Sequence, residues 1–240
     1  MTSARDRAAA PGAKTLEVFA NTPRLNAWLF SKLSSGVRGD VLEVGSGIGN
    51  MSRLILPHAS RLVVTDAEPR CLNELRQTFA GHERVEVVAY DLDGPPPAAV
   101  SARSYDTIVA VNVIEHIAED LALVSRLAGL LRSGGHLLIY APACPGAYGP
   151  LDTTLGHYRR YTPASLTTLL RAAQLDSGRP RYVNLLGLAG WFFNGRVLRR
   201  KVLSLRSVAL FERLVPLVRL EDRVSLPRGL GLFTQATKPT

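Results

Sequence analysis

A glycine-rich turn that directly follows an apolar stretch constrains the fold of this chain more than any other feature. Residues 41–44 have the sequence Val-Leu-Glu-Val and predict a short strand, and Gly45, Gly47 and Gly49 follow at once. Apolar residues then recur at helical spacing over residues 51–55. Because glycine lets the backbone turn sharply and a helix N-terminus offers free N–H groups, this turn predicts a site for a phosphate or carboxylate group.

The first 140 residues alternate between expected strands and expected helices. The helix expected over residues 120–131 has a C-terminal stop in Arg-Ser-Gly-Gly at residues 132–135. Strands that alternate with helices of about 10–15 residues predict a parallel sheet with helices on both faces. The expected strands cover residues 41–44, 61–65, 85–88, 105–111 and 136–140, with a further helix over residues 70–79.

Beyond residue 140 the alternation stops. Residues 141–162 contain several prolines and glycines and predict a long loop, after which Thr162 and Pro163 begin a helix expected to reach residue 175. We then expect a strand over residues 181–186, a basic helical insertion over 187–228 interrupted by Pro216, and a last, antiparallel strand over 230–237. The predicted sheet therefore has seven strands and is mostly parallel.

The length of 240 residues and the apolar fraction of 46% suit one packed domain and are short for two. We expect a disordered N-terminus over residues 1–13 and a single domain over 14–240. Its predicted parts are an N-terminal helical cap (14–36), a core (37–186), the basic helical insertion (187–228) and the last strand with a tail (229–240).

Composition excludes several classes of protein. The 2 cysteines can build neither a disulfide scaffold nor a cysteine zinc site. The longest apolar run is far shorter than the roughly 20 residues of a membrane span, and no apolar stretch follows the charged N-terminus, so we expect a cytoplasmic protein without a signal peptide. The net charge is +9, and residues 191–240 hold 10 basic against 3 acidic residues. The basic character therefore belongs to one surface.

The motif E-x-G-x-G-x-G at residues 43–49 resembles the first motif of class I S-adenosylmethionine-dependent methyltransferases. A dinucleotide-binding fingerprint, G-x-G-x-x-G, would need glycine at position 50, which is Asn50. Asp66 ends the expected second strand, 19 residues after Gly47, where a carboxylate can accept both hydroxyls of a ribose. The structural alternative is that Asp66 caps the next helix.

Further segments extend this resemblance. Asp91 matches the acidic residue that receives the adenine amino group in the family, and residues 112–117 (Asn-Val-Ile-Glu-His-Ile) resemble its motif after the fourth strand. Residues 156–162 (Gly-His-Tyr-Arg-Arg-Tyr-Thr) and 184–191 resemble a bacterial branch, for which we expect a role in small-molecule biosynthesis. The resemblance implies a Rossmann-like α/β fold, S-adenosylmethionine as cofactor and S-adenosylhomocysteine as product. The implied cofactor-binding residues are Glu43, Gly45, Ser46, Gly47, Gly49, Asn50, Asp66, Ala67, Asp91, Leu92 and Asn112.

Methyl transfer needs a nucleophile held in line with the sulfonium methyl group and a base for its proton. His157 is the first candidate for the general base, since histidine titrates near neutral pH and this one lies in the long loop. Alternatively, His157 fixes the loop by hydrogen bonds to backbone or to Asp152. His116 and Tyr158 are further catalytic candidates, and we expect transfer to oxygen or nitrogen.

The acceptor is expected to be a small molecule. No pair of histidines occurs at metal-binding spacing, so we expect no metal. The candidate substrate-binding residues are aromatic or cationic, and each could instead pack in the core or pair with an acid; they are Trp28, Tyr148, Arg159, Tyr161 and Trp191.

Three other functions remain open. A carbon methyltransferase would act on an electron-rich ring such as an indole or phenol. A nicotinamide oxidoreductase would use the same sheet, although the glycine spacing argues against it. A non-catalytic module would bind a membrane or, less favourably, nucleic acid through residues 195–223, where Arg199, Arg206 and Arg213 would form one stripe of an amphipathic helix. The alternative, which we favour, is that this helix only caps the domain with its charges in water. The sequence leaves a monomer or a homodimer equally open.

Overall fold

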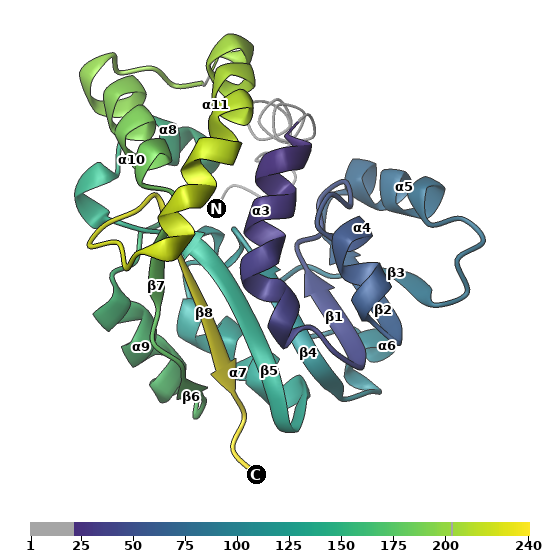
Figure 1. The fold of residues 1–240 in the computed structure, drawn as a ribbon. Helices are drawn as coiled ribbons and strands as arrows, with labels where there is room; N and C mark the ends of the chain where they lie inside the picture. The colour runs from purple at the N-terminus through teal and green to yellow at the C-terminus, as the bar shows by residue number, and fades with distance from the viewer. Residues whose placement is uncertain (1–21, 203) are drawn as a thin grey trace.

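The computed structural model describes residues 22–202 and 204–240, and Figure 1 shows their arrangement. The predicted disorder of residues 1–13 and the first part of the predicted cap lie outside these residues. One sheet runs through the described chain in the order β3-β2-β1-β4-β5-β8-β6, and β7 also pairs with β8. Helices cover both faces of this sheet (Figure 1).

The parallel half of the sheet is built from β1 (Asp40–Val44), β2 (Arg61–Asp66), β3 (Val85–Ala89) and β4 (Tyr105–Val111). Strands β1, β2 and β4 are apolar and almost wholly buried, as expected for strands covered on both faces. Because these strands are parallel, the residues that follow each of them meet at one edge of the sheet. That edge is where ligands bind in open α/β sheets.

The other half of the sheet corrects the predicted strand number. Strand β8 (Gly231–Thr237) is antiparallel to β5 (Leu131–Pro142), as expected. On its other edge β8 pairs first with β7 (Arg181–Val183) and then with the short β6 (Asp176–Ser177). The sheet thus has eight strands, because two short strands share one edge of β8 where the sequence predicted a single one.

Two cores hold the helices against the sheet. On one face the buried residues come from α3 (Pro23–Leu33), α4 (Ser52–Ile55), α5 (Pro69–Thr78) and α11 (Leu205–Val218). On the other face they come from α6 (Ala98–Ser101), α7 (Asp120–Leu130) and α9 (Pro163–Ala172). The remaining helices, α8 (Pro150–Leu155) and α10 (Leu185–Phe192), lie near the carboxyl edge of the sheet (Figure 1).

Thr162 caps α9 as predicted, since its hydroxyl oxygen accepts a hydrogen bond of 3.0 Å from the Ser165 backbone. The predicted end of α7 was wrong: the helix ends at Leu130, and Gly134 lies inside β5 with a φ of 72°. Glycine at this position adopts the positive φ of a turn within the strand without strain, and it does not end the helix.

The predicted single basic helix was also wrong. A π-type turn over Phe193–Val197 follows α10, and Arg199 has a φ of 49°, which no α-helix contains. α11 begins only after Ser204, so Arg206 and Arg213 share a helix and Arg199 does not. Pro216 lies within α11 near its end. Among the described residues, the structure contains no helix with the length and apolar character needed to cross a bilayer.

Candidate active site

The glycine-rich turn leaves β1 in a conformation that favours glycine. Gly45, Gly47 and Gly49 have φ values of 65°, 56° and 85°. A Cβ atom on Gly45 would lie 2.7 Å from Cγ2 of Val113, so glycine lets the segment after β4 come into contact with this turn. The turn after β1 and the residues after β4 therefore form one continuous surface at the edge of the sheet.

Asp66 stands at the tip of β2 beside this turn. Its Oδ2 accepts a hydrogen bond of 2.8 Å from the Gly47 backbone, and its Oδ1 accepts one of 2.9 Å from the Glu68 backbone. The N-cap residue of α5 is Glu68, so the alternative in which Asp66 caps the helix was wrong. Burial raises the pKa of Asp66, and backbone hydrogen bonds from Glu68, Gly47 and Ala67 oppose that shift. The carboxylate is half-buried at this edge of the sheet.

Glu43 is buried beneath the turn with 3% of its surface exposed. The Ser52 hydroxyl donates a short hydrogen bond to its Oε2. Burial raises the pKa of Glu43 to about 7, and the hydrogen bond from Ser52 acts in the opposite direction. In the family that the sequence resembles, this residue receives the amino group of the cofactor.

We expect Glu43→Gln to flatten the pH dependence of stability. Between pH 4.5 and pH 7 folded Glu43 keeps a proton that the unfolded chain has lost, so the free energy of unfolding falls as pH rises through this window. The loss amounts to about 3 kcal/mol for a shift of this size. Urea unfolding at pH 5, 6, 7 and 8 measures it, with the exposed Glu83→Gln as control. If the free energy of unfolding depends on pH in the same way in Glu43→Gln and in the parent protein, this prediction is wrong.

The other predicted cofactor residues line the same edge in different ways. Asp91 is exposed, and its Oδ1 accepts a hydrogen bond of 3.1 Å from the Asp93 backbone. Asn112 is exposed directly after β4 with a φ of 53°, while Ala67 is exposed after β2. The Ser46 hydroxyl instead points inward and accepts a hydrogen bond of 3.2 Å from Thr65, which ties the turn to β2. Asn50 and Leu92 are half-buried and buried, respectively.

His157 is held by a buried charge network that centres on Asp152. Its Nδ1 lies 2.9 Å from Asp152 Oδ1, as in the alternative in which His157 fixes the loop. Arg160 donates to the same oxygen over 2.7 Å and also to the Ala143 carbonyl over 2.9 Å. Trp191 donates to Asp152 Oδ2 over 3.2 Å. Burial acts to raise the pKa of Asp152, but the hydrogen bonds from His157 and Arg160 bring it below its ordinary value.

Asp152 orients the histidine ring. A carboxylate only accepts hydrogen bonds, so His157 Nδ1 is the nitrogen that donates to Asp152. Nε2 lies 4.0 Å from Glu115 Oε1. His116 Nε2 is also 4.0 Å from this atom, and the two imidazole rings are 4.7 Å apart in an edge-on arrangement.

Glu115 is the residue of this cluster that sequence reasoning missed, together with the role of Arg160, whereas Asp152 was named as a partner of His157. It is fully buried, and burial raises its pKa to about 8. Burial, followed by the nearby His157, lowers the pKa of His116 to about 4. The sequence did mark Glu115, because it lies within the motif after the fourth strand. It did not mark the contact with His157, which is 41 residues from His116 and reaches Glu115 only in the folded chain.

Most of the predicted substrate-binding side chains are engaged within the protein. Trp28 is fully buried in the packing of α3 and donates to Asp222, so its predicted place in a substrate site was wrong. Arg159 pairs with Asp120 at 2.6 Å, and the Tyr161 hydroxyl donates to the same carboxylate over 2.8 Å. These two residues match the packing alternatives. The catalytic candidate Tyr158 is exposed, and its backbone N–H donates to the Glu115 carbonyl over 2.8 Å.

Tyr148 and Trp191 lie close to the histidine cluster, which consists of Glu115, His116 and His157. The Tyr148 hydroxyl donates a hydrogen bond of 2.7 Å to the His157 carbonyl. The Trp191 ring is buried, with the Arg160 guanidinium 4.9 Å from its centroid. Both aromatic residues therefore support the loop that carries His157.

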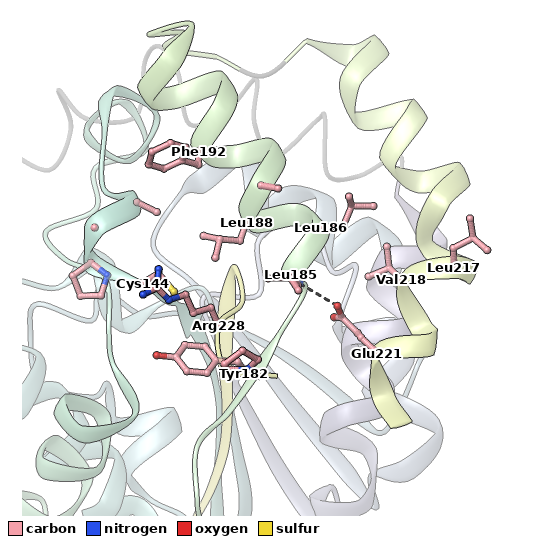
Figure 2. Close-up of a pocket in the computed structure, with 15 residues that line it drawn as sticks. Cys144, Tyr182, Leu185, Leu186, Leu188, Phe192, Leu217, Val218, Glu221 and Arg228 are labelled. Carbon is pink, nitrogen blue, oxygen red and sulfur yellow. Dashed lines mark hydrogen bonds between the residues drawn. The ribbon is translucent and has the colours of Figure 1, made fainter. Parts of the chain in front are cut away.

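One pocket of the described chain lies apart from the glycine-rich turn. It has a volume of about 970 Å³ and is lined mainly by apolar residues of α10 and the end of α11 (Figure 2). Glu221 accepts hydrogen bonds from the first backbone N–H groups of α10, including one of 3.1 Å from Leu185, at one side of this pocket (Figure 2). None of the predicted cofactor residues lines it, so we do not place the reaction there.

Comparisons with known proteins agree with this geometry. Residues 42–137 match a family model described as a methyltransferase domain. A protein of Mycolicibacterium smegmatis, named as a probable S-adenosylmethionine-dependent methyltransferase, is 34% identical over 142 residues, which cover 57% of this chain and 52% of that relative. This chain thus spans about half the length of that relative.

Solved structures share the fold. The N-methyltransferase NodS of Bradyrhizobium japonicum, solved with S-adenosyl-L-homocysteine, matches with a TM-score of 0.58 at 18% identity, over 89% of this chain and 85% of NodS. An S-adenosylmethionine-dependent methyltransferase of Clostridium acetobutylicum matches with a TM-score of 0.59 at 12% identity, over 92% and 93% of the two chains. The predicted fold class is confirmed: this chain has the Rossmann-like fold of class I methyltransferases, and residues 42–137 match their methyltransferase domain.

Proposed function

We propose that this chain transfers a methyl group from S-adenosylmethionine to an oxygen or nitrogen of a small-molecule acceptor. The observation that carries the proposal is the pairing of the glycine-rich turn with Asp66, whose Oδ2 is 2.8 Å from the Gly47 nitrogen at the ligand-binding edge of the sheet. Calorimetric titration with S-adenosylmethionine, S-adenosylhomocysteine and NADH tests it. Binding of both adenosyl compounds without NADH supports it, and binding of NADH alone would refute it.

We expect Asp66→Ala to weaken the binding of S-adenosylmethionine by about 1–3 kcal/mol, because the ribose hydroxyls lose a charged acceptor. Calorimetry on the folded variant measures this loss. Asp93→Ala, an exposed carboxylate in a nearby turn, is the control and should keep the affinity of the parent protein. An affinity that stays unchanged in Asp66→Ala would remove Asp66 from the cofactor site.

The acceptor would lie beside the histidine cluster, since Val113 touches the glycine-rich turn two residues before Glu115. In the displacement the acceptor oxygen or nitrogen bonds to the methyl carbon, the carbon–sulfur bond breaks, and sulfur keeps the electron pair. His157 is our proposed general base and takes the acceptor's proton on Nε2, while Asp152 holds the ring through Nδ1. His116 and Tyr158 flank this position. The role of general base requires a free lone pair on Nε2 of His157.

We also propose that residues 195–223 touch an anionic membrane surface. They contain eight basic and three acidic residues, and half of the large exposed apolar side chains of the described chain. Each acid is engaged elsewhere: Glu212 with the N-terminus of α3, Glu221 with that of α10, and Asp222 with Lys32. The outward surface is therefore basic and apolar, the combination that suits an acidic bilayer.

Sedimentation with lipid vesicles tests this surface. We expect binding to vesicles that contain phosphatidylglycerol but not to pure phosphatidylcholine, and we expect added salt to weaken it. Replacing Arg199 and Arg200 with glutamate should abolish the binding, whereas glutamates at Arg70 and Arg76 on α5 should leave it intact. Equal binding to both vesicles by every variant would contradict the proposal.

A further inference from the structure

Three side chains of the histidine cluster have the placement of metal ligands. Glu115, His116 and His157 each offer one ligand atom, and these atoms all lie within 4.8 Å of one another. Glu115 Oε1 is 4.0 Å from Nε2 of each histidine. In a tetrahedral site with bonds of about 2.0–2.2 Å, ligand atoms lie about 3.4 Å apart, so each histidine nitrogen needs to approach Glu115 Oε1 by only about 0.6 Å.

The His157 imidazole is held through its other nitrogen, as metal-binding histidines are. His157 Nδ1 is hydrogen-bonded to the Asp152 carboxylate at 2.9 Å. The Gly156 backbone hydrogen-bonds the His116 imidazole. In a neutral imidazole, a partner that accepts from Nδ1 leaves the lone pair on Nε2. Two separate segments therefore bring an Nε2 atom to the same carboxylate.

The Glu115 carboxylate has no partner of its own. It is fully buried, and neither oxygen has a hydrogen-bond partner among the described residues. The buried cation Arg160 donates its hydrogen bonds to Asp152 and to the Ala143 carbonyl and not to Glu115. Buried carboxylates are almost always hydrogen-bonded, paired or bound to a metal, so a cation between Glu115 and the two histidines supplies what the fold leaves missing.

We propose that Glu115, His116 and His157 bind one divalent transition-metal ion, with Zn²⁺ as the best fit. Two imidazoles and one carboxylate form a known ligand set of catalytic zinc sites, which keep a fourth position open. Mg²⁺ and Ca²⁺ prefer ligand sets made of oxygen and fit less well. The His116 side chain is 38% exposed, so the ion can enter from its side.

The ion would act on the acceptor and not on the cofactor. An acceptor oxygen in the open position loses its proton more readily, because the cation stabilises the oxyanion. The proton then goes to solvent, since the ion occupies His157 Nε2, and the oxyanion takes the methyl group as the carbon–sulfur bond breaks. This role rests on the proposed methyl transfer, whereas ion binding itself does not. An ion and a free general base use the same lone pair, so occupancy decides which role His157 has.

The test uses the full chain without an affinity tag, stripped with EDTA and dialysed, in the absence of S-adenosylmethionine. Titration with Zn²⁺ by calorimetry and with Co²⁺ by visible absorption should show one ion per chain and the d–d bands of low-coordinate Co²⁺. Glu115→Gln and His116→Ala should each weaken the binding at least about tenfold. His82→Ala, an exposed histidine outside the cluster, should bind as the parent does. Circular dichroism establishes that each variant is folded.

Two results would overturn the inference: a parent protein that binds no stoichiometric ion, or binding that is equal in the parent and in both cluster variants. A separate titration of the stripped protein with S-adenosylmethionine keeps the two proposals distinct. Cofactor binding without ion binding overturns only the ion site. Ion binding without cofactor binding supports the ion site and refutes the proposed methyl donor.

Discussion

Replacing Arg160 with methionine should lower the free energy of unfolding by about 3–5 kcal/mol. The Arg160 side chain is 1% exposed, and its removal leaves the charge of Asp152 buried without its guanidinium partner. The variant also loses the hydrogen bond to the Ala143 carbonyl and the contact with the Trp191 ring. Truncating one partner of a buried pair is costly because the remaining charge stays desolvated.

The neighbouring arginine gives a matched control for this prediction. Arg159 pairs with Asp120 near the surface, with 33% of its side chain exposed, so Arg159→Met should lose at most about 1 kcal/mol. Urea unfolding followed by circular dichroism measures both variants. A double variant, Asp152→Asn with Arg160→Met, removes both charges and should recover part of the loss. Equal stabilities of the two single arginine variants would contradict the prediction.

His157→Ala should slow turnover by about a hundredfold or more at saturating S-adenosylmethionine, while the affinity for the cofactor stays unchanged. The reason is that the variant lacks the proposed general base, whereas the glycine-rich turn makes no hydrogen bond to His157 among the described residues. Methyl transfer to a panel of hydroxyl, amine and phenol acceptors measures the rate. His82→Ala is the control, and normal turnover in His157→Ala would leave His157 only its role in fixing the loop.

The same assay separates the two roles proposed for Nε2. A general base works in protein stripped of metal, so chelation would leave the rate of the parent unchanged. If His157 instead acts as a ligand of the ion, chelation would lower the rate of the parent protein and added Zn²⁺ would restore it. His157→Ala is slow in either case, which is why the metal dependence of the parent protein carries the distinction.

The cofactor half of the site was predictable from the sequence because its signals are local. The glycine-rich turn lies within ten residues, and Asp66 follows a strand whose apolar run is unmistakable. Strand ends that are parallel meet at one edge, so the order of the motifs was enough to bring Gly47 and Asp66 together. A hydrogen bond of 2.8 Å joins them in the structure.

The histidine cluster could not be predicted in the same way. Glu115 and His116 are adjacent in sequence, but Asp152 lies in α8 and His157 in the segment that follows it, within the region predicted as one long loop. The prediction that Trp28 binds substrate was wrong for a related reason. The sequence of an amphipathic helix does not show whether an aromatic side chain lines a pocket or packs in the core. Likewise, the seven-residue spacing that linked Arg199 to Arg206 carried no sign of the positive φ between the two helices.

The position of β8 has a consequence for how this protein would aggregate. β8 is hydrogen-bonded to the twelve-residue strand β5 on one side and to β6 and β7 on the other, and within residues 22–202 and 204–240 those two short strands pair with no other strand. If β8 detaches, β5 presents a long and largely apolar edge with unpaired backbone groups, the feature that recruits strands from other molecules. A variant that loosens β8 would therefore be recognised first by self-association rather than by loss of helix content.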